Sequence, residues 1–264
     1  DTKIICIDVT GDYKDRLSDL SPIALGLNQK NIETLGELLF QIEVGEFSAS
    51  GEKRALKQFV DQITPTLQQN IREFLSSSDA SLGLFELPDI ANTRATLRAT
   101  ELFLSQIFNW AKLNRTGKSV QIVLEEAHTI VPEANFYYRD RADTQAAIGR
   151  VTQIALQGRK YGVGLLIVSQ RTALVSKTIL SQCNTCITFN LVDKTSLDYL
   201  DSVYSSQHVK VIPNLKFLQA LVFGKAVKSE RPVIVEIPYE QGKKDASAHL
   251  QIQDTISGRE VAST

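Results

Sequence analysis

Residues 119–129 read Ser-Val-Gln-Ile-Val-Leu-Glu-Glu-Ala-His-Thr, an apolar run that ends in two adjacent carboxylates. A buried strand followed at once by charge places Glu125 and Glu126 at the carboxyl edge of a sheet, where open α/β folds bind ligands. One carboxylate at such a position can hold hydrated Mg²⁺, and the next can orient and deprotonate a water that attacks a phosphate. The pair therefore indicates nucleotide hydrolysis. The other interpretation is a solvated strand end with no chemical role.

The phosphate-binding loop that such a centre needs is absent from the sequence. No GxxxxGK[S/T] string, whose backbone N–H groups and lysine hold phosphates, occurs in the 264 residues. The closest string, Gly117–Lys118–Ser119, has Lys112 where the upstream glycine should stand, and it precedes the carboxylate strand. We interpret it as a turn. The chain also begins directly with an apolar strand at Ile4 and has no Met, so we expect a fragment whose N-terminal part, including the phosphate loop, is missing.

Composition is that of an ordinary globular chain. Hydrophobic residues make up 43% and charged residues 22%, which is enough for one sizeable core at this length. No apolar run approaches the roughly 18 residues of a membrane span, and no signal peptide is visible, so we expect a cytoplasmic protein without a membrane partner. The net charge of −1 means that any DNA contact must come from local clusters. Cys183-Asn-Thr-Cys186 is a lone CxxC, for which core packing is favoured over a zinc or redox site.

Strand and helix patterns alternate along the chain, which predicts an α/β fold with a mostly parallel sheet and helices on both faces. Apolar residues at helical spacing predict a helical insertion over about 28–78 and further helices at 92–114 and 143–160. The core is expected to span residues 1–238, with a polar C-terminal tail at 239–264. The predicted strands are 3–9, 82–87, 120–125, 163–168, 184–191, 217–223 and 232–237.

Two further sites have both a functional and a structural interpretation. Asp8 ends the first strand in Asp-Val-Thr-Gly-Asp-Tyr, where it can either bind a cofactor at the ligand edge or hold an Asx-type turn. Arg159 lies in Gln-Gly-Arg-Lys-Tyr-Gly, before a glycine that suits a helix C-cap. A basic residue there either favours the helix dipole or acts as an arginine finger on a phosphoryl-transfer transition state.

Two loops are candidate ligand contacts. In Ser-Gln-Arg, after the strand at 163–168, Gln170 can hydrogen-bond a γ-phosphate or the attacking water and report the nucleotide state. The loop from Thr129 to Asp143 interleaves aromatic residues with arginines, a pattern that suits nucleic-acid contacts but also a partly packed surface loop. Its candidate DNA-binding residues are Tyr137, Tyr138, Arg139 and Arg141.

The order of these motifs resembles the HerA-type ATPases, which belong to the HerA/FtsK group of P-loop DNA translocases. The resemblance covers about residues 3–238, and its most specific part is the block at 158–171 followed by Leu180–Thr185. It implies a RecA-like P-loop NTPase core, incomplete here at its N-terminal side, where a small β-barrel and the Walker A phosphate loop would stand. It also implies ATP and Mg²⁺ as cofactors, a homo-hexameric ring that moves double-stranded DNA, and a nuclease or effector partner.

Position by position, the resemblance makes Glu125 the Mg²⁺-side carboxylate and Glu126 the catalytic base. Arg159 corresponds to a finger that reaches the neighbouring subunit, and Gln170 to a phosphate sensor that contacts the cofactor, as Asp8 also would. The loop after Glu126 faces the channel in ring translocases. The loop after Gln170, with Arg171 and Lys177, is the second candidate for DNA contact. Without the phosphate loop, residues 1–264 are expected to be inactive alone.

Two other classes remain open. A DExH-type helicase also carries Glu-Glu-Ala-His, but it needs a Ser-Ala-Thr motif and a second motor domain, and the sequence has neither. The other is a ring-forming scaffold ATPase that assembles an effector protein without productive translocation. Turnover measured with and without DNA separates a scaffold from a translocase.

Overall fold

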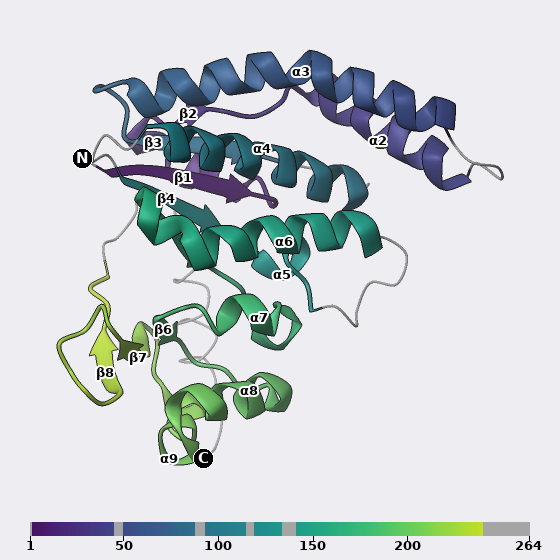
Figure 1. Ribbon diagram of the computed structural model, residues 1–264. Coiled ribbons are helices and arrows are strands. Elements are labelled where there is room, and N and C mark those ends of the chain that lie inside the picture. Colours follow the sequence, from purple (N-terminus) through teal and green to yellow (C-terminus); the bar gives the residue numbers. More distant parts are fainter. Residues whose placement is uncertain (1, 45–49, 88–92, 115–118, 134–140, 240–264) are drawn as a thin grey trace, which may run out of the picture. The chain divides into compact units, whose positions relative to one another are not determined.

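The computed structural model describes residues 2–44, 50–87, 93–114, 119–133 and 141–239 (Figure 1). Contacts divide the chain into two compact units, Asp1–Cys183 and Asn184–Thr264. Each unit has its own sheet. The predicted core over residues 1–238 therefore extends across both units.

The first unit is built on a five-stranded parallel sheet with strand order β2-β3-β1-β4-β5. β1 lies in the middle, paired with β3 on one side and β4 on the other. Its near-continuous apolar run fits this position, because a central parallel strand is covered on both faces. The two-residue β2 was missed by the sequence pattern, since so short a strand gives no period. The strands are β1 (Thr2–Asp8), β2 (Ile23–Ala24), β3 (Leu82–Glu86), β4 (Ser119–Leu124) and β5 (Val163–Ile167).

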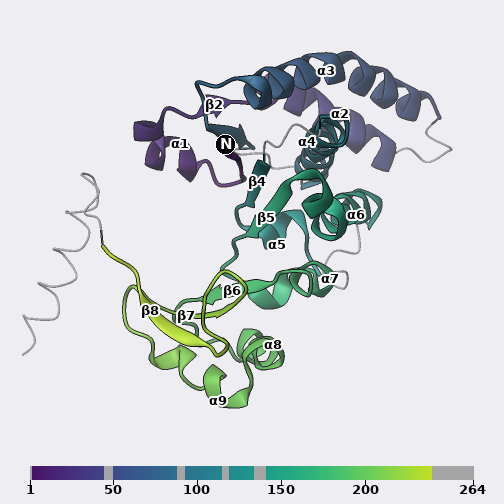
Figure 2. The same ribbon diagram turned by 60° about the vertical axis from the view of Figure 1, so that its left-hand side comes forward.

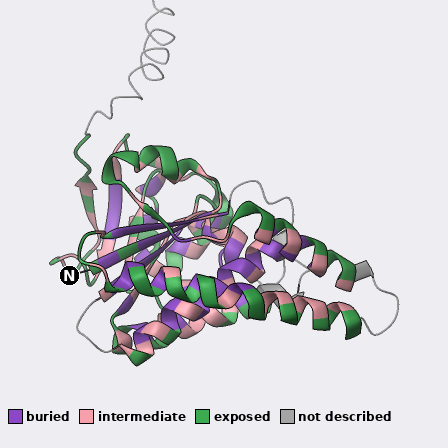
Figure 3. Cartoon of the chain, turned by 90° about the horizontal axis from the view of Figure 1, so that it is seen from above, coloured by how far each residue is buried: buried purple, intermediate pink, exposed green. Residues whose placement is uncertain are grey.

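The long helices pack on one face of this sheet and build the main core. Ile5 and Ile7 of β1 point into it, together with Phe85 of β3, which stacks on Phe103 with ring centroids 3.9 Å apart. In Figure 3 buried residues lie along the central strands and on the inward sides of the long helices. The expected insertion at 28–78 is present as two helices that lie side by side (Figure 1). The four helices are α2 (Gln29–Val44), α3 (Ser50–Ser76), α4 (Thr93–Leu113) and α6 (Arg141–Gln157).

The opposite face of the sheet has a smaller cover. Cys6 of β1 and Val123 of β4 lie on this face, and the apolar side chains packed against them include Tyr13 and Leu17. Tyr13 belongs to the short helix α1 (Asp12–Arg16), which the sequence pattern also missed. Successive side chains of a strand point to opposite faces of the sheet. Asp8 lies two residues after Cys6, and Glu125 two residues after Val123, so both side chains lie on this face as well.

The second unit corrects the expectation that the last strands extend the parallel sheet. They form a separate antiparallel sheet of order β6-β7-β8 (Figure 2). Alternating burial along β8 fits an antiparallel sheet with one open face. Its core forms where Leu200 and Tyr204 pack with Leu221. The elements are β6 (Thr185–Thr188), α8 (Lys194–Tyr204), α9 (Ser206–Val209), β7 (Gln219–Gly224) and β8 (Val233–Glu236).

Within the part of the chain that the structure describes, no helix is long and apolar enough to cross a membrane.

Candidate functional site

The carboxyl ends of β1, β4 and β5 meet at one edge of the five-stranded sheet. Hydrogen bonds continue the ladder beyond the strands, because Glu125 N donates to Ile7 O at 3.1 Å and Val168 N donates to Leu124 O at 3.0 Å. The carboxylate pair therefore stands beside Asp8 on one side and the turn at Ser169 on the other. The sequence predicted this edge for the pair, and the strand order brings the three strand ends together.

Asp8 shapes the turn that follows β1. It is 0% exposed, and its Oδ1 accepts hydrogen bonds from Thr10 N, Thr10 Oγ1 and Gly11 N, each at 2.9 Å. Its Oδ2 accepts a fourth from Tyr13 N at 2.8 Å. These are the contacts of the Asx-type turn interpretation. The carboxylate thereby fixes the start of α1. Asp8 would therefore affect a cofactor only indirectly, by holding the shape of this turn.

Glu125 is held by a tyrosine on the same face of the sheet, which sequence reasoning did not single out. Tyr13 Oη donates to Glu125 Oε2 at 2.9 Å. Burial raises the pKa of Glu125; the bond from Tyr13 lowers this pKa, and the charges of Glu126, Asp8 and Asp12 raise it. Burial and then the contact with Glu125 raise the pKa of Tyr13 in turn. The site thus concentrates negative charge in a partly desolvated place.

That surplus of negative charge fits a divalent cation. Mg²⁺ takes oxygen ligands, keeps several waters, and is bound in nucleotide sites by one or two carboxylates together with phosphates. No cluster of three or more His, Cys, Asp or Glu able to hold a metal occurs among the described residues. The carboxylate of Glu125 has the oxygen-donor chemistry that such a cation takes.

Glu126 follows with an unusual backbone. Its φ of 43° lies in the left-handed region, which non-glycine residues rarely adopt and which often marks functional sites. It stands at the N-cap of the short helix α5 (Ala127–Ile130). Its Oε2 lies 3.0 Å from Nδ1 of His128, which in turn lies 3.3 Å from Ser169 Oγ. His128 is the second contact that the sequence did not reveal, although it stands in the motif itself.

The turn after β5 carries the other predicted polar residues. Gln170 is exposed, directly after Ser169, whose Oγ accepts a hydrogen bond from Arg171 N at 3.1 Å. Arg171 is also exposed. Gln170 therefore lies at the same sheet edge as the carboxylates, in a position open to a ligand.

A short pairing joins the segment after α5 to the segment after β5. Glu133 N donates to Leu174 O at 2.7 Å, and Ser176 N donates to Val131 O at 2.9 Å. Glu133 Oε2 also accepts a hydrogen bond from the backbone N of Lys177 at 2.8 Å. Lys177 begins the helix α7 (Lys177–Leu180) and is exposed. The two loops predicted to contact DNA are thus tied together at their roots.

Arg159 lies at the opposite end of β5. It is exposed in the 3₁₀ helix η2 (Gly158–Tyr161), which precedes the strand. Gly162 ends that helix with φ 70° and donates its N–H to Arg159 O at 3.3 Å, as predicted for a C-cap. β5 is parallel to β4, so Arg159 and Glu126 lie at opposite edges of the sheet. The structure does not bring these two predicted site residues together within one chain.

The remaining predicted residues are only partly described. Tyr137, Tyr138 and Arg139 lie outside the described residues. Arg141 is the first residue of α6, and its side chain is likewise outside the described part. Cys183 is exposed rather than packed in a core, while Cys186 packs in the second unit.

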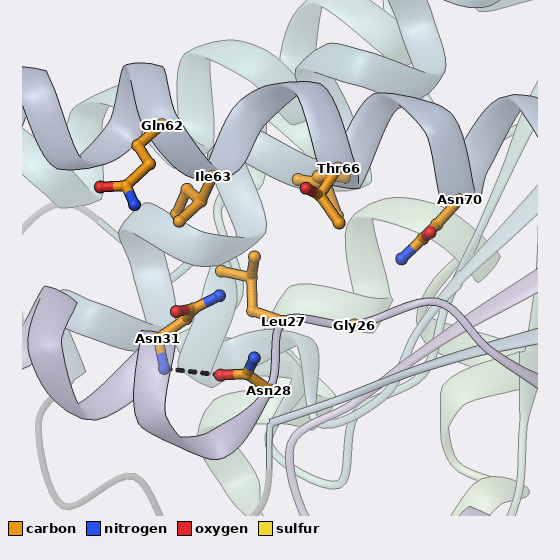
Figure 4. Close-up of a pocket in the computed structure, with 9 residues that line it drawn as sticks. Gly26, Leu27, Asn28, Asn31, Gln62, Ile63, Thr66 and Asn70 are labelled. Atoms are coloured by element: carbon orange, nitrogen blue, oxygen red, sulfur yellow. Dashed lines mark hydrogen bonds between the residues drawn. The ribbon is translucent and has the colours of Figure 1, made fainter.

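A depression of about 390 Å³ lies at the β2 edge of the sheet, between the loop after β2 and α3 (Figure 4). β3 and β1 separate β2 from the carboxylate strand β4. The lining of the depression contains amides, a hydroxyl and apolar side chains but no charged group, so the depression does not suit a phosphate. The lining residues are Gly26, Leu27, Asn28, Asn31, Gln62, Ile63, Thr66, Leu67 and Asn70.

The parallel sheet with its carboxylate edge is an α/β core of the RecA-like P-loop NTPase class. VirB4 of Thermoanaerobacter pseudethanolicus shares this fold, with a TM-score of 0.60 at 13% identity over 90% of this chain and 82% of that one. No protein-family model matches the chain.

Sequence comparison confirms the resemblance to HerA-type ATPases. The chain is 34% identical over 121 residues to the DNA double-strand break repair helicase HerA of Pyrococcus furiosus, which covers 45% of this chain and 20% of the relative. It is 31% identical over 130 residues to a probable helicase of Methanocaldococcus jannaschii, covering 48% and 23%. The matched segment thus spans about a quarter or less of the length of these curated relatives.

Proposed function

We propose that residues 1–264 form part of an ATP-dependent translocase or helicase that moves double-stranded DNA. The observation that carries this proposal is the placement of Glu125 and Glu126 on a left-handed turn at the carboxyl edge, next to the turn that bears Gln170. The similarity to HerA helicases supports it from the sequence, and the fold shared with VirB4 agrees.

In this proposal the nucleotide lies over the carboxyl edge with Mg²⁺ beside Glu125. Bound Mg²⁺ would neutralise phosphate charge during transfer. Glu125, kept in place by Tyr13 Oη, would hold the water shell of the cation. Glu126 would take the proton from the attacking water, and Gln170 would contact the γ-phosphate. The phosphate loop would come from sequence outside residues 1–264, for which the relatives, about twice as long as this chain, leave room.

Arg159 supports an assembly in which neighbouring chains complete each other's sites. Its side chain is exposed and lies a full strand length from Glu126 of its own chain. An arginine finger at this position would act on the next subunit, as in a closed homo-hexameric ring. The same ring would gather copies of the loops at 134–141 and 171–177 around a channel for DNA. A nuclease or effector partner, and a location in the cytoplasm, complete the proposal.

Glu126→Gln is the test of the catalytic assignment. In the longer, ATP-hydrolysing protein, this variant should keep ATP binding and lose at least about 100-fold in turnover, the low end for removing a positioned general base. Glu37→Gln, which changes an exposed glutamate on α2, is the matched control. Near-normal turnover in Glu126→Gln would favour the other interpretation, in which Glu125 and Glu126 are a solvated strand end with no chemical role. DNA-independent turnover in the wild type would favour the scaffold ATPase instead.

A further inference from the structure

The imidazole of His128 lies between a carboxylate and a hydroxyl that belong to two different strand ends. Its Nδ1 is 3.0 Å from Glu126 Oε2 and 3.3 Å from Ser169 Oγ. The side chains of His128 and Glu126 are 16% and 14% exposed. Both contacts use the same ring nitrogen, which carries one hydrogen at most.

One nitrogen cannot serve both neighbours equally. The contact with Ser169 Oγ has hydrogen-bond geometry. Glu126 Oε2 is buried and has no hydrogen-bond partner despite its short distance to the same nitrogen. A buried, unsatisfied carboxylate oxygen is unfavourable, so a small rotation of the imidazole from Ser169 towards Glu126 would be favoured once Ser169 withdraws.

The backbone around Glu126 is fixed by hydrogen bonds, so the imidazole of His128 is the part that can move between Glu126 and Ser169. The carbonyl oxygen of Glu126 accepts hydrogen bonds from Thr129 N at 2.8 Å and Thr129 Oγ1 at 2.9 Å. Ala127 N donates to Val168 O at 2.9 Å, which fastens the turn to β5. Ser169, by contrast, stands in the turn that continues into the exposed Gln170.

We propose that His128 is a positioning residue that exchanges Ser169 for Glu126 as its partner and so fixes the Glu126 carboxylate for catalysis. This inference rests on the proposed function above. A γ-phosphate that engages Gln170 draws the neighbouring Ser169 away, and Nδ1–H then donates to Oε2. The second carboxylate oxygen, Oε1, stays free to accept the proton of the attacking water.

Kinetics of the longer, ATP-hydrolysing protein test the positioning role. His128→Ala should lower kcat by about 10-fold, as expected for a partner behind a reacting group, while KM for Mg·ATP changes by less than about 2-fold. His128→Asn, whose amide places a donor near the Nδ1 position, should restore much of kcat. A rise in KM without a fall in kcat would overturn the proposal.

A double-mutant cycle separates this inference from the catalytic assignment of Glu126. If His128 acts through Glu126, adding His128→Ala to Glu126→Gln should cause no further loss of kcat. A multiplicative loss would refute the positioning role and leave the base assignment intact. An active Glu126→Gln single variant would instead refute the proposed function itself.

A measurement on residues 1–264 needs no turnover. In the proposed resting arrangement the Ser169 hydroxyl donates to Nδ1, so its removal in Ser169→Ala should shift His128 towards the Nδ1–H tautomer in ¹⁵N NMR at pH 8. The matched control is Ser205→Ala, which removes the hydroxyl 3.0 Å from Nδ1 of His208 and should leave the His128 signals unchanged. An unchanged His128 tautomer in Ser169→Ala would contradict the shared-nitrogen arrangement.

Discussion

Arg159→Ala and Glu126→Gln should each abolish turnover in separate rings, yet mixing the two proteins should restore part of it. β5 has five residues, and at about 3.3 Å per residue it sets Arg159 roughly 16 Å from the edge that carries Glu126. That distance is too long for an arginine side chain to bridge within one chain. If both residues act on one nucleotide, as proposed, Glu126 and Arg159 would therefore come from different subunits.

The expected recovery follows from counting interfaces. In a random ring made from equal amounts of the two variants, an interface works when an Arg159→Ala subunit supplies the base and a Glu126→Gln subunit supplies the finger. That occurs at roughly a quarter of the interfaces of a closed ring. Steady-state ATPase at a series of mixing ratios should thus peak near equal amounts, at roughly a quarter of the wild-type rate if sites act independently.

The control is Lys160→Ala, which removes the neighbouring exposed basic side chain of η2 and should remain active by itself. Subunit exchange is followed by fluorescence transfer between labelled rings. No recovery in rings that have exchanged subunits would refute the finger and leave Arg159 as a residue of the helix cap alone. Arg159→Lys should be inactive too, because lysine lacks the planar fork of the guanidinium.

Three further predictions concern nucleotide, DNA and pH. Residues 1–264 alone should show no measurable ATPase and at best weak nucleotide binding; calorimetry giving micromolar affinity for Mg·ATP would mean that the phosphates are held in another way. Replacing Arg139 and Arg141 with Ala in the longer protein should weaken DNA binding and flatten its salt dependence, similarly across DNA sequences, because fewer phosphates are neutralised; an unchanged salt slope would move the contact to Arg171 and Lys177. The folded-state pKa of Glu125 is raised above its ordinary value of 4.5, so the folded state binds the carboxyl proton more tightly than the unfolded state. The free energy of unfolding should therefore fall as pH rises from about 4.5 through the raised pKa. Glu125→Gln should therefore be more stable than wild type to urea at neutral pH, with the difference shrinking towards pH 4. Equal stability at pH 7 would show that the ionised carboxylate of Glu125 does not destabilise the folded state.

The sequence predicted those parts of the molecule that depend on local pattern. The apolar run before Glu125 predicted both strand β4 and its charged end, and helical spacing predicted the two helices of the insertion. The sequence pattern could not predict which strands would pair, so the antiparallel pairing of β6, β7 and β8 was missed. A polar run such as Asp12–Arg16 gives no amphipathic signal, which left α1 unpredicted.

Contacts between side chains from distant segments were equally out of reach. Tyr13 and Glu125 are 112 positions apart in the sequence, and their bond depends on the neighbouring positions of β1 and β4. His128 was visible in the motif, but its role between Glu126 and Ser169 depends on how closely β5 approaches α5. Arg159 shows the reverse case, because its distance from Glu126 follows from strand direction alone.

The pairing of Val131–Glu133 with Leu174–Lys177 bears on how force passes through the molecule. Its three hydrogen bonds are spaced along a few residues of two antiparallel segments, so a load on either loop is shared in shear between them. The segment Val131–Glu133 cannot be displaced without moving Leu174–Lys177 as well. In the proposed translocase, each subunit would then present the two loops to DNA as one moving element with a single stroke length and stiffness.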